Sequence, residues 1–206
     1  MSESISPAQQ QSIADFCQSA AFFRPDAALK IEQYWHILSS WQKKNNLTGF
    51  TDVDTWLTKG VFDAYGLMSE LQRGDQVLDV GSGSGLPGMV VACCMNDVSV
   101  VAVERRHKRA AFLRAAAHAC DCDVRVIQGD VSQVKEQFSV ITARALAPPD
   151  VLIEMTKHCA QAKTRWICPQ TPCDIDTAGT WCQWAHKGHQ YHWWVSAPDT
   201  YHSKHG

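Results

Sequence analysis

Three glycines at alternating positions could bring the backbone close to a cofactor. They are Gly81, Gly83 and Gly85, and they lie within residues 79–88, which read DVGSGSGLPG. Glycine adopts a positive φ angle without steric penalty and has no Cβ to collide with a ligand. A helix that begins after such a turn also presents free N–H groups to the negative end of a ligand. The spacing therefore predicts a cofactor cradle, with a merely structural glycine turn as the alternative.

Two cofactor classes fit this turn. Residues 83–88 match the pattern G-x-G-x-x-G, so a nicotinamide dinucleotide is one candidate. S-adenosyl-L-methionine is the other, and two details favour it. Asp79 stands two residues before the first glycine, where its carboxylate can meet the ammonium group of that cofactor. The glycine run also begins at the end of the preceding apolar segment, whereas the dinucleotide match begins two residues later.

Polar side chains follow the next three apolar segments. Glu104 stands 19 residues after Gly85, close to the spacing of about 20 for an acid that binds ribose hydroxyls. A carboxylate that accepts two hydroxyl hydrogen bonds gives strong, charge-assisted recognition, although an exposed acid at a strand end is also possible. Asp130 could meet an adenine edge. Arg144 follows the fourth segment, where the transferring methyl group would lie, and both a ligand role and a structural ion pair remain open.

Strand and helix alternate around these residues from position 76 onward. We therefore expect an α/β fold with a doubly wound, mostly parallel sheet that binds ligands at the carboxyl ends of its strands. The expected strands are 76–80, 98–103, 124–128, 138–142 and 165–168, and the expected helices are 87–95, 108–119 and 150–160.

Helical spacing of apolar residues dominates the first seventy positions. It predicts three helices. The first begins near Pro7, the second covers residues 29–41 and the third covers residues 56–71. We expect residues 1–72 to form a helical extension packed on a cofactor-binding core at 73–206, within one globular domain. Tryptophans after residue 171 predict packed structure in the tail, whereas residues 202–206 are expected to fray.

Composition narrows the class of protein. The chain has 206 residues, of which 45% are hydrophobic, but no apolar run approaches the ~20 residues of a membrane span. Residues 1–14 do not resemble a secretory signal, so we expect a soluble, cytoplasmic protein. Its nine cysteines lack the spacing of a zinc site, which predicts reduced thiols and no metal. The net charge of −2 means that any nucleic acid must meet local basic clusters, at 43–44 and 105–109.

Four stretches together resemble the bacterial small-subunit ribosomal RNA guanine-N7 methyltransferase family, called RsmG or GidB. Residues 46–48 resemble its N-L-T signature, and residues 79–88 resemble its D-V-G-[ST]-G-x-G-L-P-G turn. Residues 108–114 are similar to its K-R-x-x-F-L-R helix, and residues 143–147, ARALA, to its S-R-A-F-A turn. The similarity runs from about residue 30 to residue 168. G-L-P-G and A-R-A-x-A are its most specific parts.

The resemblance implies a Rossmann-like class I methyltransferase that uses S-adenosyl-L-methionine. Its substrate would be N7 of one guanine in 16S ribosomal RNA, within the small subunit or its precursor, and a monomer is favoured. Asn46, Lys59 and Asp63 would lie near the guanine, and Glu104 would bind the cofactor ribose. The other residues that the resemblance places at the cofactor are Gly81, Leu86, Val131, Ser132 and Arg144.

Several positions depart from the family pattern. Lys59-Gly60 stands where the family has Arg-His, and residues 169–171, PQT, stand where it has Lys-Gly. Asp130 replaces a typical arginine. The R-H-L stretch that opens the family's last strand corresponds to residues 200–202, with only four residues after it. A diverged methyltransferase with another substrate, and a Rossmann-like protein that binds S-adenosyl-L-methionine without catalysis or binds NAD, therefore remain alternatives.

Overall fold

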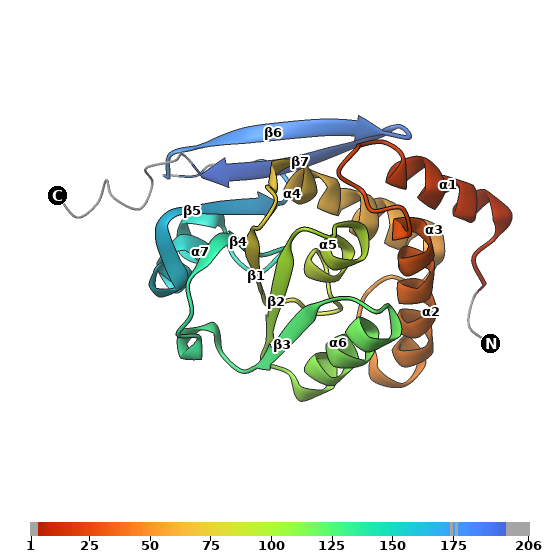
Figure 1. Cartoon of the computed structure of the whole chain (residues 1–206), viewed down its shortest axis with the longest axis horizontal. Helices are drawn as coiled ribbons and strands as arrows, with labels where there is room; N and C mark the ends of the chain where they lie inside the picture. The colour runs from red at the N-terminus through yellow and green to blue at the C-terminus, as the bar shows by residue number, and fades with distance from the viewer. Residues whose placement is uncertain (1–3, 174, 176, 197–206) are drawn as a thin grey trace.

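Seven strands form one sheet in the computed structural model, which describes residues 4–173, 175 and 177–196. The sheet order is β3-β2-β1-β4-β5-β7-β6 (Figure 1). The first five strands are parallel, whereas β7 is antiparallel to both of its neighbours. This order confirms the predicted α/β fold class. The strands are β1 Gln76–Val80, β2 Ser99–Glu104, β3 Val124–Gln128, β4 Phe138–Thr142, β5 Ala160–Pro169, β6 Gly179–His186 and β7 His189–Ser196.

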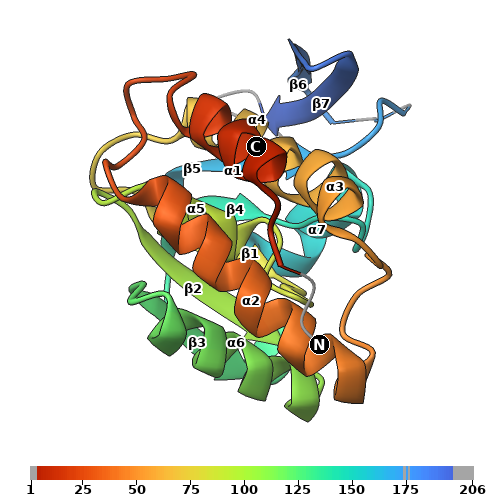
Figure 2. The ribbon, with the colours of Figure 1, turned by 90° about the vertical axis from the view of Figure 1, so that its right-hand side faces the viewer.

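Helices cover both faces of the sheet. On one face, α5 (Gly88–Cys94) and α6 (His107–Ala119) pack on the strands, and α2 (Ala27–Asn45) packs across both helices (Figure 2). α1 (Pro7–Cys17) packs on α2. On the other face, α7 (Pro149–Thr156) packs against β5. Two apolar cores result, one on each side of the sheet, and the larger one lies beneath the N-terminal helices.

The N-terminal helices begin and end where local chemistry requires. Ser6 caps α1, because its hydroxyl accepts a hydrogen bond from the Gln9 N–H while the Gln9 side chain accepts from the Ser6 N–H. α2 ends at Asn45, and the next residue, Asn46, caps it with a φ of 46°, in the left-handed region that asparagine tolerates. Both helices were predicted from the sequence, with α2 extending further at each end.

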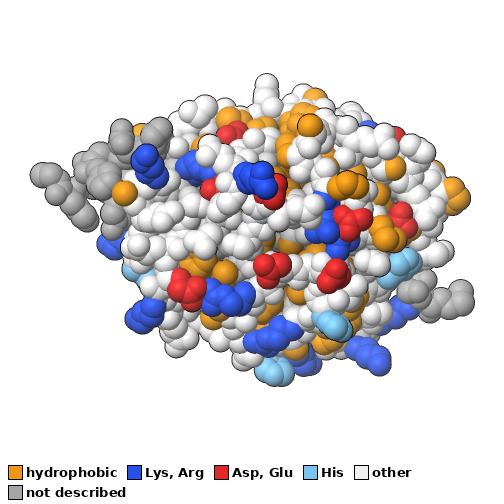
Figure 3. Space-filling view, viewed as in Figure 1, with side chains coloured by type: hydrophobic (Ala, Val, Ile, Leu, Met, Phe, Trp, Pro, Cys, Tyr) orange, Lys and Arg blue, Asp and Glu red, His pale blue; other side chains and the backbone are white. Residues whose placement is uncertain are grey.

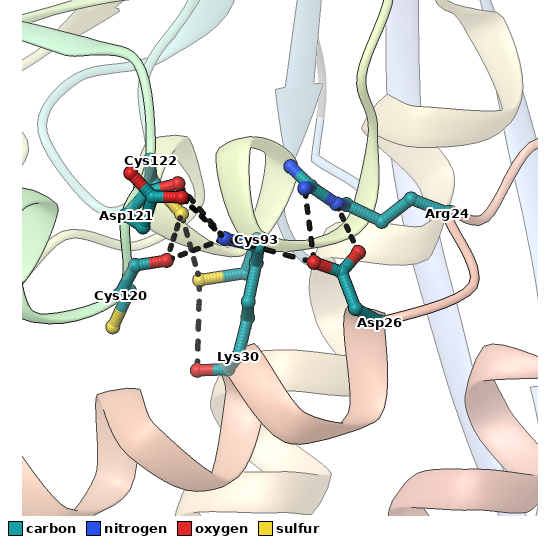
Figure 4. A network of polar contacts seen from close by, with 7 residues as sticks. All are labelled: Arg24, Asp26, Lys30, Cys93, Cys120, Asp121 and Cys122. Atoms are coloured by element: carbon teal, nitrogen blue, oxygen red, sulfur yellow. Dashed lines mark hydrogen bonds and ion pairs between the residues drawn. The ribbon is translucent and has the colours of Figure 1, made fainter.

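A buried lysine connects α2 to the loop after α6. Lys30 donates hydrogen bonds from Nζ to the carbonyl oxygens of Cys120 (2.7 Å) and Asp121 (2.8 Å), as Figure 4 shows. The Sγ atoms of Cys93 and Cys122 lie 3.7 Å apart in the same network. All nine cysteines are free, and eight of them are buried or half-buried. Within the described part of the chain, no helix is long and apolar enough to cross a membrane.

The single helix expected at 56–71 is wrong in its form. The chain is helical there, but it divides into α3 (Val53–Trp56), a π-helical turn (Leu57–Val61), a 3-10 turn (Phe62–Ala64) and α4 (Tyr65–Glu70). In the π turn, the Phe62 N–H donates to the Leu57 carbonyl, five residues earlier. The Lys59 carbonyl accepts a hydrogen bond from the distant Arg144 side chain. A contact from outside the segment therefore accompanies the break in the regular helix.

The C-terminal part also differs from expectation. The helix expected at 150–160 ends at Thr156, and after a 3-10 turn the longer β5 begins at Ala160. β6 and β7 form a hairpin whose turn residues, Lys187 and Gly188, both have positive φ angles (49° and 78°). β7 pairs with β5, so a last strand is already present upstream of residues 200–202. Those residues, and the frayed end expected at 202–206, lie outside the described part of the chain.

Candidate active site

The glycine turn is fixed to the neighbouring strand. The Gly81 N–H donates to the Val103 carbonyl of β2 at 2.9 Å, and the Gly85 N–H donates to the Ser82 carbonyl at 2.7 Å. The φ angles of Gly81, Gly83 and Gly85 are 72°, 60° and 95°, so all three need the left-handed region that glycine alone adopts freely. A Cβ added to Gly83 would lie in ordinary van der Waals contact with the Gly81 carbonyl oxygen (3.7 Å) and with Arg109 Nη1 (3.9 Å), so no atom of the described residues would collide with it.

Asp79 lies beneath this turn and is fully buried. Its Oδ2 accepts a hydrogen bond from the Gly88 N–H at 3.0 Å, at the start of α5. A Cβ at Gly88 would approach Oδ2 to 2.6 Å, so only glycine allows this contact. Oδ1 has no partner among the described residues. Burial raises the pKa of the Asp79 carboxyl to about 6, because the charged form loses its water.

Glu104 faces the same turn from the end of β2. It is 5% exposed, and its carboxylate accepts hydrogen bonds from the N–H groups of Gly83 (2.9 Å) and Arg106 (2.7 Å). Each oxygen keeps a further lone pair, since a carboxylate offers about four acceptor sites. The sequence prediction that Glu104 binds ribose stays a prediction, and its position beside Gly83 is compatible with that role.

Residues 130–132 lie next to Glu104. The Gly129 N–H donates to the Glu104 carbonyl at 3.1 Å, which holds the end of β3 beside the end of β2. Asp130 caps the 3-10 turn Val131–Gln133 by accepting from the Ser132 N–H at 3.0 Å. That hydrogen bond lowers the pKa of Asp130, and the exposed Arg105 side chain lies 3.5 Å from its carboxylate. The Asp130 carboxylate therefore caps the turn through the Ser132 N–H, and its contact with an adenine edge stays a prediction.

Arg144 and Asp63 form a second cluster, beyond the end of β4. Arg144 donates from Nε to Asp63 Oδ2 at 2.8 Å and from Nη2 to the Lys59 carbonyl. Its guanidinium also lies 5.9 Å from the centre of the Phe50 ring. Burial raises the pKa of Asp63, and the adjacent Arg144 partly opposes this shift. Arg144, Asp63 and Lys59, which the sequence analysis placed near the methyl group or the guanine, thus lie in one cluster.

Leu86 brings the glycine turn close to Gly60, next to Lys59, whereas Asn46 has an exposed side chain. Leu86 is 5% exposed, and a Cβ at Gly60 would lie 3.0 Å from its Cδ1. A histidine at position 60, as in the family pattern, would therefore require Leu86 to move. Asn46 is exposed at the end of α2, and the following loop is held by the Gln42 side chain, which accepts from the Leu47 N–H at 2.7 Å.

Sequence reasoning missed several residues of the site. Tyr34 donates from its hydroxyl to the Ser84 carbonyl and so supports the glycine turn from α2, and only the helical spacing of its neighbours marked it. Phe50 follows the N-L-T stretch and contacts Arg144. Leu146 lies above the turn, because its Cδ1 is 3.1 Å from the Cβ position of Gly81.

A cavity of about 350 Å³ lies beside Phe50, and another of about 320 Å³ lies beside Arg144. The second cavity joins the Arg144 cluster to the ends of β5 and β7. The sequence predicted Asp63 and Arg144 in this region, but it gave no role to the residues of the hairpin. The cavity is lined by Asp63, Arg144, Ala145, Pro169, Gln170, Thr171, Gln190, Tyr191 and His192.

Comparison with known proteins decides between the two cofactor classes. The rRNA small subunit methyltransferase G family matches residues 28–171, which is most of the chain. The chain belongs to this family. Membership confirms the predicted resemblance, the S-adenosyl-L-methionine-dependent methyltransferase class and the cofactor, and it decides against the NAD reading. The site residues themselves stay predictions.

Curated relatives give the same result. The chain is 30% identical over 141 residues to ribosomal RNA small subunit methyltransferase G of Methylobacillus flagellatus, covering 67% of this chain and 68% of the relative. It is 38% identical over 130 residues to the Rhodopseudomonas palustris protein of the same name, covering 60% and 58%. For the Neisseria gonorrhoeae protein the values are 33% identity and 65% of each chain. The chain thus matches about three fifths to two thirds of each relative.

Solved structures support the fold. A SAM dependent methyltransferase from Aquifex aeolicus aligns with 77% of this chain and 96% of its own, with a TM-score of 0.52 and 14% identity. MtNAS in complex with MTA and tNA aligns with 92% of this chain and 76% of its own, with a TM-score of 0.53 and 18% identity. At these identities the likeness concerns the fold alone.

Proposed function

We propose that this protein transfers a methyl group from S-adenosyl-L-methionine to N7 of a guanine in 16S ribosomal RNA. The substrate would be the small ribosomal subunit or its precursor in the cytoplasm, and the enzyme would act as a monomer. One observation carries the proposal: the glycine turn, Glu104 and the Arg144–Asp63 pair lie at or just beyond the carboxyl ends of the neighbouring strands β1, β2 and β4. This edge is where sheets of this type bind ligands.

The residues of the turn fit the cofactor. Gly83 has no Cβ that could obstruct a ligand, and the lone pairs of Glu104 can accept hydrogen bonds from ribose hydroxyls. The unpartnered Oδ1 of Asp79 can accept a bond from an ammonium group. Val131 and Ser132, beside Glu104, would border the adenine. The ribose and the ammonium group thus each have a carboxylate acceptor with unused lone pairs, on Glu104 and on Asp79.

The chemistry requires little acid–base catalysis. Bound S-adenosyl-L-methionine supplies an electrophilic methyl group. Guanine N7 is already an acceptor with an available lone pair, so no base has to remove a proton before attack. The protein then positions the guanine and stabilises the charge that develops on it. Asp63 is suited to that role because it is an anion at the cavity wall, and Arg144 fixes its orientation.

The surface charge is consistent with a ribonucleoprotein substrate. Figure 3 shows acidic and basic side chains interspersed over one face of the molecule, without a broad basic area on that face. A local basic cluster, residues 105–109, begins one residue after Glu104. Arg109 comes closest to the turn, with Nη1 3.9 Å from the Cβ position of Gly83. Such a cluster can meet phosphates beside the cofactor, while the shape of the subunit supplies further contacts.

The proposal is tested with small subunits from a bacterium that lacks its own enzyme of this family. The purified protein and S-adenosyl-L-methionine with a labelled methyl group should label 16S ribosomal RNA, and chemical cleavage at N7-methylguanine should map one site. Gly83→Val is the matched negative control. Labelling at another base or in another RNA would overturn the guanine assignment.

A diverged methyltransferase is the second candidate, because Gly60 and Gln170 replace basic residues of the family pattern. If S-adenosylhomocysteine binds but the subunits remain unlabelled, this second candidate is supported. If neither S-adenosylhomocysteine nor S-adenosyl-L-methionine binds, both candidates fail.

A further inference from the structure

Two cysteines lie close together on the face of the sheet that α2, α5 and α6 cover. Cys93 belongs to the last turn of α5, and Cys122 lies in the loop between α6 and β3. Their Sγ atoms are 3.7 Å apart, although the residues are separated by 29 positions of the chain (Figure 4). A disulfide bond is about 2 Å long, so the two sulfur atoms would have to approach each other by roughly 1.7 Å.

Backbone contacts hold Cys122 in this position. Lys30 Nζ donates to the carbonyl oxygens of Cys120 (2.7 Å) and Asp121 (2.8 Å), so the loop is tied to α2. The Cys122 N–H donates to the Ala117 carbonyl at 2.9 Å, which ties the loop to the last turn of α6 as well. The loop therefore keeps the Cys122 sulfur beside its neighbour in α5 without a covalent bond.

The two thiols differ in their surroundings. Cys93 is fully buried, whereas Cys122 is half-buried and follows Asp121, whose side chain is exposed. The hydrogen bond with Cys93, followed by the positive charges of Lys30 and Arg24, lowers the pKa of Cys122. Hydrogen bonds with neighbouring thiols, together with burial, raise the pKa of Cys93. Because the thiolate is the reactive form of cysteine, these surroundings favour Cys122 as the nucleophile of the pair.

We propose that Cys93 and Cys122 form an oxidation site for hydroperoxides, in which Cys122 reacts first and Cys93 resolves the product. The Cys122 sulfur forms a bond to one peroxide oxygen, the O–O bond breaks, and the leaving oxygen takes up the thiol proton as water or an alcohol. The Cys93 sulfur then forms a bond to the sulfur of this sulfenic acid, the S–O bond breaks, and the hydroxide leaves with the Cys93 proton as water. One peroxide is reduced, and two thiols are oxidised to a disulfide that a dithiol can reduce again.

The position of the bond predicts its effect on the protein. It would connect α5 to the chain just before β3 and would close a loop of the chain that contains β2 and α6. Oxidation should therefore raise the melting temperature by about 5–10 °C, because the bond restricts the unfolded chain. Cys93 lies near the end of α5 opposite Gly88, where the glycine turn ends, so affinity for S-adenosylhomocysteine should not change.

The test exposes the dilute, reduced full chain to a few equivalents of hydrogen peroxide, blocks the remaining thiols and digests the protein with trypsin. Cleavage after lysine and arginine leaves Cys93 in the peptide 74–105 and Cys122 in the peptide 115–125. Mass spectrometry should find these two peptides linked, lighter than their sum by two hydrogen atoms, and separate after treatment with a dithiol. Absence of this link from the oxidised wild type would overturn the inference, whether or not the protein methylates RNA.

Each peptide contains one further cysteine, so matched variants assign the bond. Cys93→Ala and Cys122→Ala should abolish the link, whereas the controls Cys94→Ala and Cys120→Ala should form it as fast as the wild type. A link that persists in Cys122→Ala and disappears in Cys120→Ala would place the bond elsewhere, and the inference would be wrong.

The order of the two thiols is tested by trapping. In Cys93→Ala the sulfenic acid of Cys122 has lost its partner, so a cyclic diketone that reacts with sulfenic acids should label the peptide 115–125. In Cys122→Ala the peptide 74–105 should stay unlabelled. The reverse pattern would contradict the roles of the two residues. A melting temperature that falls when the wild type is oxidised would also contradict the inference, because the bond would then distort the fold instead of forming within it.

Discussion

The two halves of the site are built in different ways. In the cofactor half, carboxylates at two strand positions accept hydrogen bonds from backbone N–H groups of a nearby turn, as Asp79 does from Gly88 and Glu104 from Gly83. In the substrate half, side chains from separate segments meet each other. Arg144 contacts Asp63 and the Lys59 carbonyl across more than 80 positions of the chain.

This difference explains which positions follow the family pattern. A turn held by backbone groups tolerates few changes, because each glycine meets a steric or conformational requirement of its own. A cluster of side chains can exchange partners when a neighbouring segment changes. The departures at Gly60 and Gln170 fall in the substrate half, whereas the departure at Asp130 lies beside Glu104, in the cofactor half but outside the glycine turn. A Cβ at Gly60 would lie 3.0 Å from Leu86 Cδ1, so that side chain would have to shift slightly.

The largest expected effect is in the cofactor half. Gly83→Val places a branched side chain on the turn, where the cofactor is proposed to bind, and should reduce binding of S-adenosylhomocysteine below detection by titration calorimetry. Methyl transfer should be lost with it. The variant also places a non-glycine residue at a φ of 60°, which costs about 1–2 kcal/mol of folding free energy.

Gly74→Val separates strain from ligand exclusion. Gly74 has a φ of 87° and no atom within 4 Å of its Cβ position, and it lies away from the cradle. It should lose a similar amount of stability while binding S-adenosylhomocysteine like the wild type. Equal binding by the wild type and Gly83→Val would show that the cradle is misassigned.

The next largest effect should come from the substrate half. Arg144→Met removes the partner of Asp63 and the charge beside the cavity, so kcat should fall about a hundredfold. Loss of the charged hydrogen bonds should reduce the free energy of unfolding by about 2 kcal/mol. Methyl-transfer kinetics and urea unfolding measure the two effects, and affinity for S-adenosylhomocysteine should change much less than in Gly83→Val.

The double variant Arg144→Met with Asp63→Asn shows whether the pair is only structural. Removing the unpaired carboxylate should recover more than half of the lost stability, because the two residues are coupled. Activity should remain low. Recovery of both stability and activity would contradict a role for the pair in methyl transfer.

Features of the site that depend on short segments could be predicted from the sequence. Features that depend on contacts between residues far apart in the sequence could not. The turn at 79–88, Glu104 and the five parallel strands follow from spacing and hydrophobic period, which are properties of short segments. The π turn at Leu57–Val61 contains a carbonyl that bonds Arg144, 85 positions away, and no local pattern indicates it. Tyr191 reaches the cavity only through the pairing of β7 with β5. The aromatic residues of the tail predicted packed structure there, but they did not indicate its place in the sheet.

A smaller effect should appear in the pH dependence of the cofactor half. The folded pKa of Asp79, about 6, lies above the ordinary value of 3.8, so the folded state binds the proton more tightly than the unfolded state. Its contribution to stability is therefore complete below pH 4 and is lost as the pH rises through 6. The loss is on the order of 3 kcal/mol. Urea unfolding of the cofactor-free protein at several pH values measures it, and Asp79→Asn should lack this component.

Cofactor affinity should change in the opposite direction. If the Asp79 carboxylate binds the ammonium group, affinity for S-adenosylhomocysteine should rise about tenfold between pH 5 and pH 7, as the carboxyl loses its proton. The same titration with Asp79→Asn should be nearly independent of pH in this range. A rise of equal size in both proteins would assign the pH dependence to another group.

The smallest expected effect concerns a departure in the substrate half. Gln170 lines the cavity beside Arg144, and its backbone N–H donates to the His192 carbonyl at 3.2 Å. Gln170→Lys returns a basic residue without disturbing that backbone contact, so stability should change by less than about 0.5 kcal/mol. If the cavity faces ribosomal RNA, the added charge should raise kcat/KM about twofold at low salt, and the gain should disappear at high salt because ions screen the phosphates. A gain that persists at high salt would mean that the lysine acts on the bound guanine itself, and a loss of activity would mean that this wall has adapted to Gln170. A gain that disappears at high salt would show that the substrate half has lost a phosphate contact. A loss of activity would show that it has replaced that contact.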